Sequence, residues 1–331
     1  MMRIKGNNTT SLLITLSILS LLLIPSSARM IANIILDKGV IAYGQVNRTG
    51  SNLTNPIAYQ NIPPKKVHVG DIDIAYKTFG KGKPLLLIAG SGATMDMWDP
   101  TVLKQLSANH TIIIFDNRGK GKTSVGTIKN MTMSQFANDA AGLMEALGIQ
   151  KPVDVIGVSL GGFIAQELAL LHPEKVDKLV IYASDCTGKI ATQASPKLMQ
   201  IVTNTSISPQ QRIIEQARIV ADMIFPQPWK KEHPNYLSYM PLVPVPSLKA
   251  IQLEAQVLGS WKGTCDKLSS INKPTLVIVG TDDVIVPPAY SLPLAEKIPG
   301  AWLVQIKGGG HGLMYQYPDK FSRIVLTFLE T

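Results

Sequence analysis

The sequence has very few cysteines and no concentrated block of positive charge. Only two of its 331 residues are cysteines, Cys186 and Cys265, too few for a disulfide framework. They could pair in an exported protein, but the sequence alone does not bring them together, and we favour two separate buried thiols. The formal net charge is +9, yet the lysines and arginines are scattered and not interleaved with aromatic residues. Nucleic-acid binding is therefore not expected.

Loops that bind nucleotides or metals are also missing from the sequence. Residues 121–123, "GKT", end like a phosphate-binding loop, but Asp116 occupies the position that needs its first glycine. Gly90 and Gly92 begin a dinucleotide-type glycine pattern, which fails at Met95. No cluster of His, Cys, Asp or Glu has the spacing of metal ligands. The sequence therefore predicts no metal site and no cofactor.

The first 44 residues differ in composition from the rest of the chain. A basic start precedes an apolar stretch at 12–24 and a small-residue exit, the order typical of a secretory signal. Cleavage is expected after Ala28 or after Gly44, and retention of the segment as a membrane tether is the competing interpretation. In both cases we predict an exported protein, secreted or held at the outer face of the membrane. Residues 45–65 are predicted to be a flexible spacer.

From residue 66 to the C-terminus the chain alternates between strand-like and helix-like segments. Residues 66–80 show the period-two alternation of an antiparallel hairpin. Short apolar runs typical of strands covered on both faces then alternate with helix-like stretches; the runs lie at 84–90, 111–116, 153–159, 178–184, 274–280 and 301–308. This order predicts an α/β protein with a mostly parallel central sheet, an N-terminal antiparallel hairpin and helices on both faces.

One connection in this pattern is much longer than the others. About ninety residues separate the sixth and seventh predicted strands, too many for a plain loop and too few for a comfortable independent domain. We predict that residues 187–255 form a helical cap inserted above the sheet. Five apolar side chains in this segment could line a pocket, although we expect most of them only to pack the cap against the sheet: Met199, Met223, Phe225, Trp229 and Met240.

The joint between the predicted strand at 153–159 and the next helix carries a serine among glycines. Gly157-Val158-Ser159-Leu160-Gly161 fits the G-x-S-x-G nucleophile elbow, with a strand before it and a helix after it. Glycines at 157 and 161 remove side chains that would clash where the chain turns sharply, so the serine hydroxyl stands clear of the sheet edge. The alternative interpretation is a glycine-rich helix start with Ser159 as its N-cap.

A serine hydroxyl needs a histidine base and a carboxylate to become a nucleophile. His311 lies between glycines just after the last predicted strand, and Asp282 and Asp283 follow the strand before it. The chain order Ser, Asp, His is the one expected with a nucleophile elbow. Asp185, which follows an earlier strand, is a second candidate for the acid.

Together these motifs resemble the α/β-hydrolase fold family from about residue 66 to the C-terminus. "LLLIAGSGATMDMW" resembles the family's oxyanion loop, "FDNRGKGKTS" its turn after the fourth strand, and "GGGHG" its histidine loop. The family pattern G-x-x-D-x-x-x-P, found here as "GTDDVIVPP", selects Asp283 as the acid. The sequence departs from the family at Ala89-Gly90, where His-Gly is usual. The predicted oxyanion donors are the backbone N–H groups of Ser91 and Leu160.

The resemblance implies a serine hydrolase that cleaves a small or medium carboxylic ester or lactone through an acyl-enzyme intermediate. Ser159 would be the nucleophile, His311 the base and Asp283 the acid, with no metal or cofactor. Relatives that open epoxides or remove halides carry aspartate at the elbow, which argues against those reactions here. A non-hydrolytic ligand-binding or receptor-like protein, a haloperoxidase and a C–C bond hydrolase remain alternatives on the same fold. The expected partner is a small-molecule substrate, and the sequence leaves the oligomeric state open.

Overall fold

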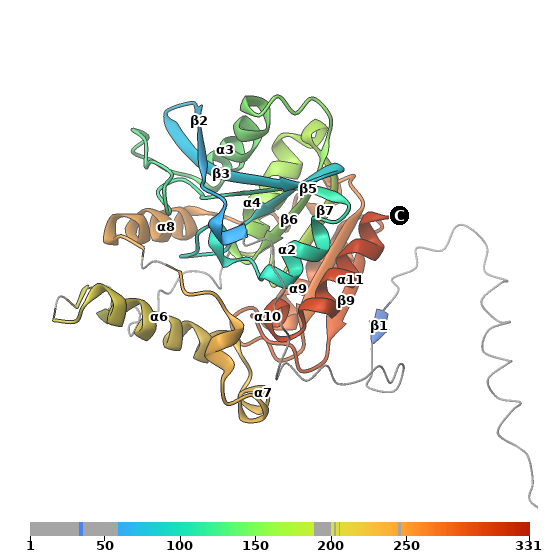
Figure 1. Cartoon of the computed structure of the whole chain (residues 1–331). Coiled ribbons are helices and arrows are strands. Elements are labelled where there is room, and N and C mark those ends of the chain that lie inside the picture. The colour runs from blue at the N-terminus through green and yellow to red at the C-terminus, as the bar shows by residue number, and fades with distance from the viewer. Residues whose placement is uncertain (1–32, 36–58, 189–199, 202, 205, 244–245) are drawn as a thin grey trace, which may run out of the picture. The chain divides into compact units, whose positions relative to one another are not determined.

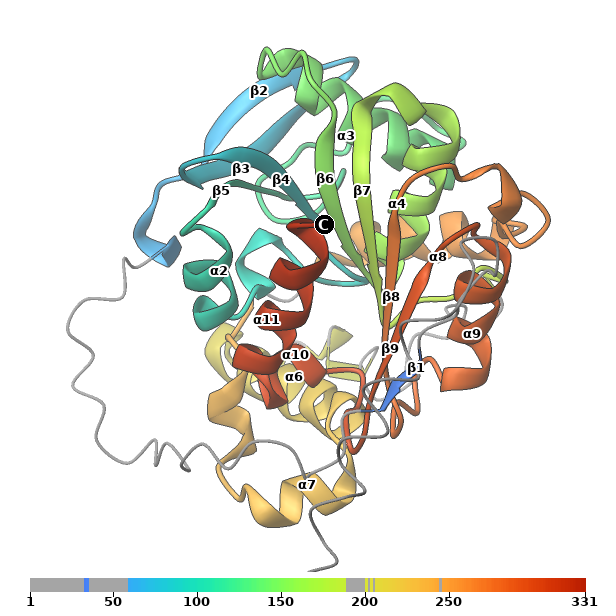
Figure 2. The same ribbon diagram turned by 90° about the vertical axis from the view of Figure 1, so that its right-hand side faces the viewer.

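The computed structural model describes residues 33–35, 59–188, 200–201, 203–204, 206–243 and 246–331. Within these residues (Figure 1) the strands form one sheet in the order β1-β9-β8-β7-β6-β4-β5-β3-β2, and Figure 2 labels all of them. Neighbouring strands are parallel except for β2–β3 and β3–β5. The strands are β1 (Asn33–Ile35), β2 (Lys65–Val69), β3 (Ile72–Gly80), β4 (Lys83–Ile88), β5 (His110–Phe115), β6 (Val153–Val158), β7 (Val176–Tyr182), β8 (Thr275–Gly280) and β9 (Trp302–Ile306).

The helices of the described residues alternate with these strands, as the sequence predicts. They are α2 (Pro100–Leu106), α3 (Met133–Ala146), α4 (Leu160–Leu171), α6 (Pro209–Ile224), α7 (Gln227–Glu232), α8 (Leu248–Ser260), α9 (Pro288–Lys297), α10 (Leu313–Gln316) and α11 (Pro318–Leu329). The predicted mostly parallel sheet with an N-terminal antiparallel hairpin is confirmed.

Each face of the sheet carries its own apolar layer. In β4, Leu86 and Ile88 join one layer and Leu85 and Leu87 join the other, because successive side chains of a strand point to opposite faces. Helices α3, α4 and α9 supply the first layer, whereas α2 and α11 supply the second, and the two sets lie on opposite sides of the sheet (Figure 2). Since both faces are covered, the strands read as continuous apolar runs in the sequence.

Most of the predicted N-terminal signal segment (residues 1–44) and of the predicted spacer (residues 45–65) lies outside the described residues. The exception in the first 44 residues is β1, a strand that the sequence analysis did not predict and that pairs in parallel with β9. At the end of the predicted spacer, Tyr59 is buried, stacks on Phe79 of β3 at 4.3 Å and hydrogen-bonds to Ser107 Oγ at 2.9 Å. None of the helices in the described ranges is long and apolar enough to cross a membrane.

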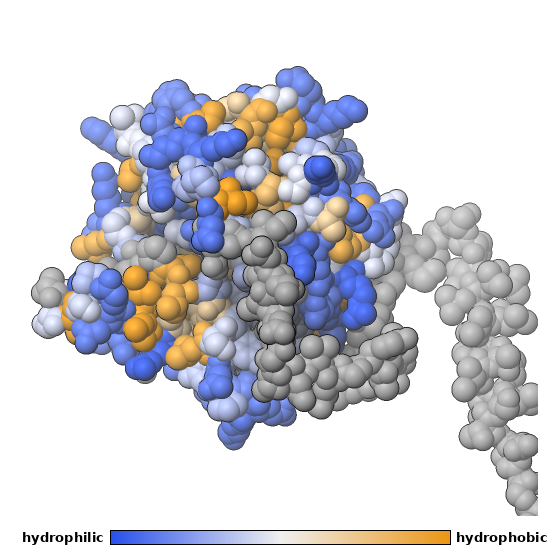
Figure 3. Space-filling view, viewed as in Figure 1, coloured by the Kyte–Doolittle hydropathy of each residue, from blue (hydrophilic) through white to orange (hydrophobic). Residues whose placement is uncertain are grey.

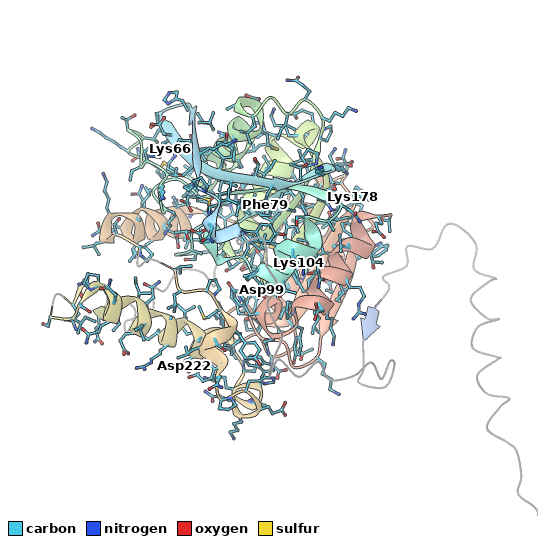
Figure 4. The ribbon with its side chains drawn as sticks, viewed as in Figure 1. Lys66, Phe79, Asp99, Lys104, Lys178 and Asp222 are labelled. Atoms are coloured by element: carbon cyan, nitrogen blue, oxygen red, sulfur yellow. A yellow bond between two sulfur atoms is a disulfide. The ribbon has the colours of Figure 1, made fainter. Side chains whose placement is uncertain are left out.

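The long connection between β7 and β8, residues 183–274, holds α6, α7 and α8, and we call it the insertion. Asp222 at the end of α6, labelled in Figure 4, accepts hydrogen bonds from Lys230 Nζ of α7 at 2.8 Å and from the Tyr236 hydroxyl at 3.2 Å. Phe225 and Trp229 pack against each other at 4.8 Å and are buried in the second apolar layer.

The five apolar residues of the predicted cap mostly pack, as expected. Besides Phe225 and Trp229, Met240 is partly buried against the same layer, whereas Met223 is 37% exposed on α6. Ile214 of the same helix is also exposed, and Figure 3 shows apolar surface in this part of the molecule. Met199 lies outside the described residues.

The prediction of two separate thiols is wrong, because Cys186 and Cys265 form a disulfide with a Cα–Cα distance of 4.9 Å. Cys186 follows β7 and Cys265 precedes β8, and β7 and β8 are neighbours in the sheet. The two ends of the insertion therefore meet at a narrow neck. Thr264 N–H donates to the Cys186 carbonyl there at 2.8 Å.

We predict that Cys265→Ser lowers the free energy of unfolding, because the disulfide closes a long loop. For a sequence separation of 79 residues, the loop-entropy relation gives at most about 4.5 kcal/mol. Urea unfolding of the oxidised wild type, the reduced wild type and the variant measures the loss. The double variant Cys186→Ser/Cys265→Ser should match the single variant, and a stability equal to the oxidised wild type would contradict a structural role for the bond.

Candidate active site

Ser159 stands at the turn between β6 and α4 in a strained backbone conformation. Its φ of 54° and ψ of −117° are rare for a residue with a side chain. A Cβ at Gly157 would lie 2.2 Å from the Gly161 carbonyl oxygen, and a Cβ at Gly161 would lie 2.1 Å from the Ile88 carbonyl oxygen. Both glycines are therefore required by close backbone contacts. Ser159 occupies the N-cap position of α4, but its side chain makes no capping hydrogen bond to the helix, so its hydroxyl does not serve as the cap.

Asp283 and His311 are brought together at the carboxyl ends of β8 and β9. His311 Nδ1 lies 2.9 Å from Asp283 Oδ2, and the Asp283 side chain is fully buried. The other carboxylate oxygen, Oδ1, accepts N–H groups from Ile285 at 2.9 Å and Val286 at 2.8 Å. A carboxylate held in this way accepts the Nδ1 proton, which leaves Nε2 of His311 as the basic nitrogen.

Asp185, the second candidate for the acid, is used elsewhere. Its Oδ1 accepts hydrogen bonds from the Thr187 hydroxyl at 2.7 Å, from Thr187 N–H and from Gly188 N–H at 3.1 Å. This carboxylate therefore shapes the start of the insertion. The geometry agrees with the family spacing in pairing Asp283 with His311.

Tyr182, the last residue of β7, contacts both the nucleophile turn and the histidine loop. Its backbone carbonyl accepts the Ser159 N–H at 3.0 Å, and its hydroxyl donates to the His311 carbonyl. The hydroxyl also accepts the Met314 N–H at 3.3 Å. Burial raises the pKa of the Tyr182 hydroxyl well above its ordinary value, so it stays protonated and keeps donating.

A second side chain ties the two arms of the histidine loop together. Gln316 Oε1 accepts the Gly310 N–H at 2.7 Å, and Gln316 Nε2 donates to the Gly308 carbonyl at 3.2 Å. The same loop packs on the insertion, because Gly312 N–H donates to the Ile224 carbonyl of α6 at 3.0 Å. The backbone that carries His311 is thus held from inside and from the insertion.

The predicted oxyanion loop, residues 89–92, lies directly beside Ser159. A Cβ at Gly90 would be 3.4 Å from the Ser159 Cβ and 3.3 Å from the Val158 carbonyl oxygen. Asn117 Nδ2 donates to the Ala89 carbonyl at 3.3 Å. The histidine that is usual at Ala89 is absent, but the loop is still anchored by side chains from other segments.

The sequence missed three of these contact residues, Tyr182, Asn117 and Gln316. A phenol at the end of the aliphatic run in β7 is the one available signal, because a buried tyrosine hydroxyl needs a partner. Asn117 and Gln316 give no comparable signal in the sequence, because their hydrogen-bond partners become neighbours only when the chain has folded. Of the predicted triad, the structure joins Asp283 and His311 by a hydrogen bond, and Ser159 is linked to their loop through Tyr182.

Comparisons with known proteins agree with this architecture. The model of the alpha/beta hydrolase fold family matches residues 83–212. The chain is 30% identical over 266 residues to BpoC of Mycobacterium tuberculosis, named as a proposed non-heme bromoperoxidase, covering 78% of this chain and 97% of that one. It is 28% identical to RutD of Azorhizobium caulinodans, named as a proposed carbamate hydrolase, covering 79% and 96%.

A solved structure shares the same fold. The enol-lactonase from Burkholderia xenovorans superimposes with a TM-score of 0.68 at 21% identity, covering 81% of this chain and all of that one. The protein therefore belongs to the α/β hydrolase fold family, and its relatives support a hydrolase.

We predict that Tyr182→Phe lowers kcat about tenfold while KM changes less than twofold. Loss of the hydroxyl releases the His311 carbonyl and leaves two buried groups unpaired, which also costs about 2 kcal/mol of stability. Steady-state kinetics and thermal unfolding measure the two effects. Tyr315→Phe is the matched control, because its buried hydroxyl donates to the Met97 carbonyl at 2.5 Å instead. Equal kcat losses in both variants would contradict a role for Tyr182 in positioning His311.

Proposed function

We propose that this protein is a serine hydrolase that cleaves a small or medium carboxylic ester or lactone. The observation that carries the proposal is the Asp283–His311 hydrogen bond, linked through Tyr182 to a serine held at positive φ at the same edge of the sheet. Among the described residues no hydrogen bond involves Ser159 Oγ or His311 Nε2, so the serine–histidine hydrogen bond is not formed in this structure. Contacts of this kind are often long before substrate binds and shorten in the complex.

In the first step, His311 Nε2 takes the Ser159 proton as Oγ attacks the substrate carbonyl carbon. Asp283 keeps the proton on Nδ1 and stabilises the imidazolium that forms. His311 then gives its proton to the leaving oxygen, and the acyl–oxygen bond breaks to leave an ester on Ser159. Water activated by His311 attacks this acyl-enzyme, and the proton passes back to Ser159 as the acid product leaves.

The negative charge on the carbonyl oxygen needs donors that are already in position. Leu160 is the first residue of α4, so its N–H has no acceptor within the helix. Ser91 N–H, in the loop beside Ser159, is the second proposed donor. Each such donor contributes roughly 3 kcal/mol to transition-state stabilisation.

The insertion is proposed to act as the cap of the site. It contacts the histidine loop through Ile224, and Pro246 Cγ lies 3.9 Å from the Cβ position at Gly92 of the oxyanion loop. A segment that contacts both loops borders the space between them and sets the size of the substrate. Carbamates form a second substrate class to test, given the likeness to RutD.

We predict that Ser159→Ala abolishes both turnover and covalent labelling. The assay follows p-nitrophenyl acetate, p-nitrophenyl butyrate, a lactone and a p-nitrophenyl carbamate, together with a serine-directed fluorophosphonate probe. Ser322→Ala is the matched control, because Ser322 is buried on α11 far along the chain and its hydroxyl has no partner within the described residues. That variant should keep wild-type activity.

The same assay separates hydrolysis from its alternatives. A folded wild type that neither labels nor turns over any of these substrates would contradict the proposal and favour a ligand-binding protein. Labelling that persists in Ser159→Ala would place the nucleophile elsewhere. Bromination that depends on Ser159 and peroxide, without ester turnover, would favour the chemistry for which BpoC is named.

Export of the protein is also proposed, and the Cys186–Cys265 disulfide supports it. Structural disulfides persist in oxidising compartments and are rare in reducing ones. We predict that cell fractionation finds the oxidised protein outside the cytoplasmic membrane, with a mature N-terminus after Ala28 or Gly44 or an intact tether. A cytoplasmic protein with the full N-terminus and two free thiols would contradict export.

A further inference from the structure

A buried ion pair outside the proposed triad joins helix α8 of the insertion to the turn after β5. Glu254 lies on α8 and Lys120 in the turn after β5, with side chains 8% and 4% exposed. Lys120 Nζ lies 2.5 Å from Glu254 Oε2, as an ion pair rather than an aligned hydrogen bond. Buried ion pairs contribute little net stability compared with apolar residues of similar size, because both charges lose water. Stability alone therefore does not explain this pair.

The carboxylate of Glu254 contacts the oxyanion loop at two consecutive residues. Its Oε1 accepts the Ser91 hydroxyl, and its Oε2 accepts the Gly92 N–H at 3.2 Å. Ser91 is the residue whose backbone N–H we propose as an oxyanion donor. Asn117 holds the loop at the Ala89 carbonyl, so Glu254 fixes the end that Asn117 does not reach.

A carboxylate so close to the oxyanion donor would by itself oppose the negative charge of the transition state. The Lys120 ammonium in contact with Glu254 offsets that charge. Helix α8 also packs directly against the turn after β5, since Leu253 Cδ2 lies 3.4 Å from the Cβ position at Gly119.

We propose that Glu254 is a positioning residue for the oxyanion hole and that Lys120 cancels its charge. The pair lets the insertion hold Ser91 in place without repelling the oxyanion. This inference rests on the proposed hydrolase function, and its test therefore includes a readout that needs no turnover.

The first arm is a double-mutant cycle between Glu254→Gln and Ser91→Ala. Each variant should lower kcat about tenfold with KM changed less than twofold, because the ground state is bound as before and the oxyanion donor is displaced. The double variant should lose little more than Glu254→Gln alone, since the Ser91–Glu254 contact that Ser91→Ala removes is one of the two loop contacts that Glu254→Gln already alters. Wild-type kcat in a folded Glu254→Gln, or losses that multiply in the double variant, would overturn the positioning role.

The second arm measures hydrogen exchange of the loop peptide covering residues 89–93. Glu254→Gln should speed exchange there, because the Gly92 N–H loses its carboxylate acceptor. Lys83→Met is the matched control: it breaks a partly buried ion pair with Asp154 at the start of β4 and β6, at the other end of the strands. The control should leave exchange in the loop and kcat unchanged. Unchanged exchange in Glu254→Gln overturns the tether even if the wild type proves not to be a hydrolase.

The third arm tests charge cancellation by the Lys120 ammonium. Lys120→Met should lower kcat more than Glu254→Gln does, because an uncompensated carboxylate then faces the oxyanion. Lys120→Met/Glu254→Gln should recover part of that loss, about threefold or more. A double variant no better than Lys120→Met would overturn the cancellation. If Lys120→Met does not fold, Lys120→Gln with the same second substitution gives the same comparison.

Discussion

The strained turn at Ser159 is the constraint on which the rest of the site depends. A non-glycine residue at positive φ costs about 1 to 3 kcal/mol and persists only where its neighbours leave no other conformation. Here the Ser159 N–H is bound to the Tyr182 carbonyl, and Gly157 and Gly161 allow backbone contacts that any side chain would block. The parallel sheet provides this rigidity, because β4 and β7 flank β6 on both sides.

The edge of the sheet then determines where the other groups must lie. Strands β4, β6, β7, β8 and β9 run in the same direction, so their following loops meet at one edge. The oxyanion loop, the serine turn, Asp283 and His311 all follow these strands. Residues far apart in the chain come together there without any long-range motif in the sequence. Tyr182 and His311 are separated by 129 positions and still share a hydrogen bond.

The sequence predicted features that depend on neighbouring residues and missed contacts between distant segments. Local patterns were sufficient for the strands β2 to β9, the flanking helices and the sharp turn at Ser159, because each is set by residues within about ten positions. Contacts between distant segments were not predictable. The disulfide is the clearest case: Cys186 and Cys265 give no local signal, and only the adjacency of β7 and β8 brings them within bonding distance. Strand β1 and the tethers from Asn117, Gln316 and Glu254 were missed for the same reason.

The disulfide and the Glu254 tether belong to one chain of constraints. The insertion leaves the sheet after β7 and returns before β8, and without a closed neck its last helix could return at many angles. The neck is closed by the disulfide and by Gln166, which donates to the Asp185 carbonyl at 2.9 Å and accepts the Thr264 hydroxyl at 2.5 Å. Helix α8 ends just before this neck, so its position is fixed, and Glu254 can reach Ser91 across 163 positions of sequence. A family loop that has lost its usual histidine at Ala89 thus takes its support from the insertion. The segment proposed to select the substrate therefore also holds the group proposed to stabilise its transition state.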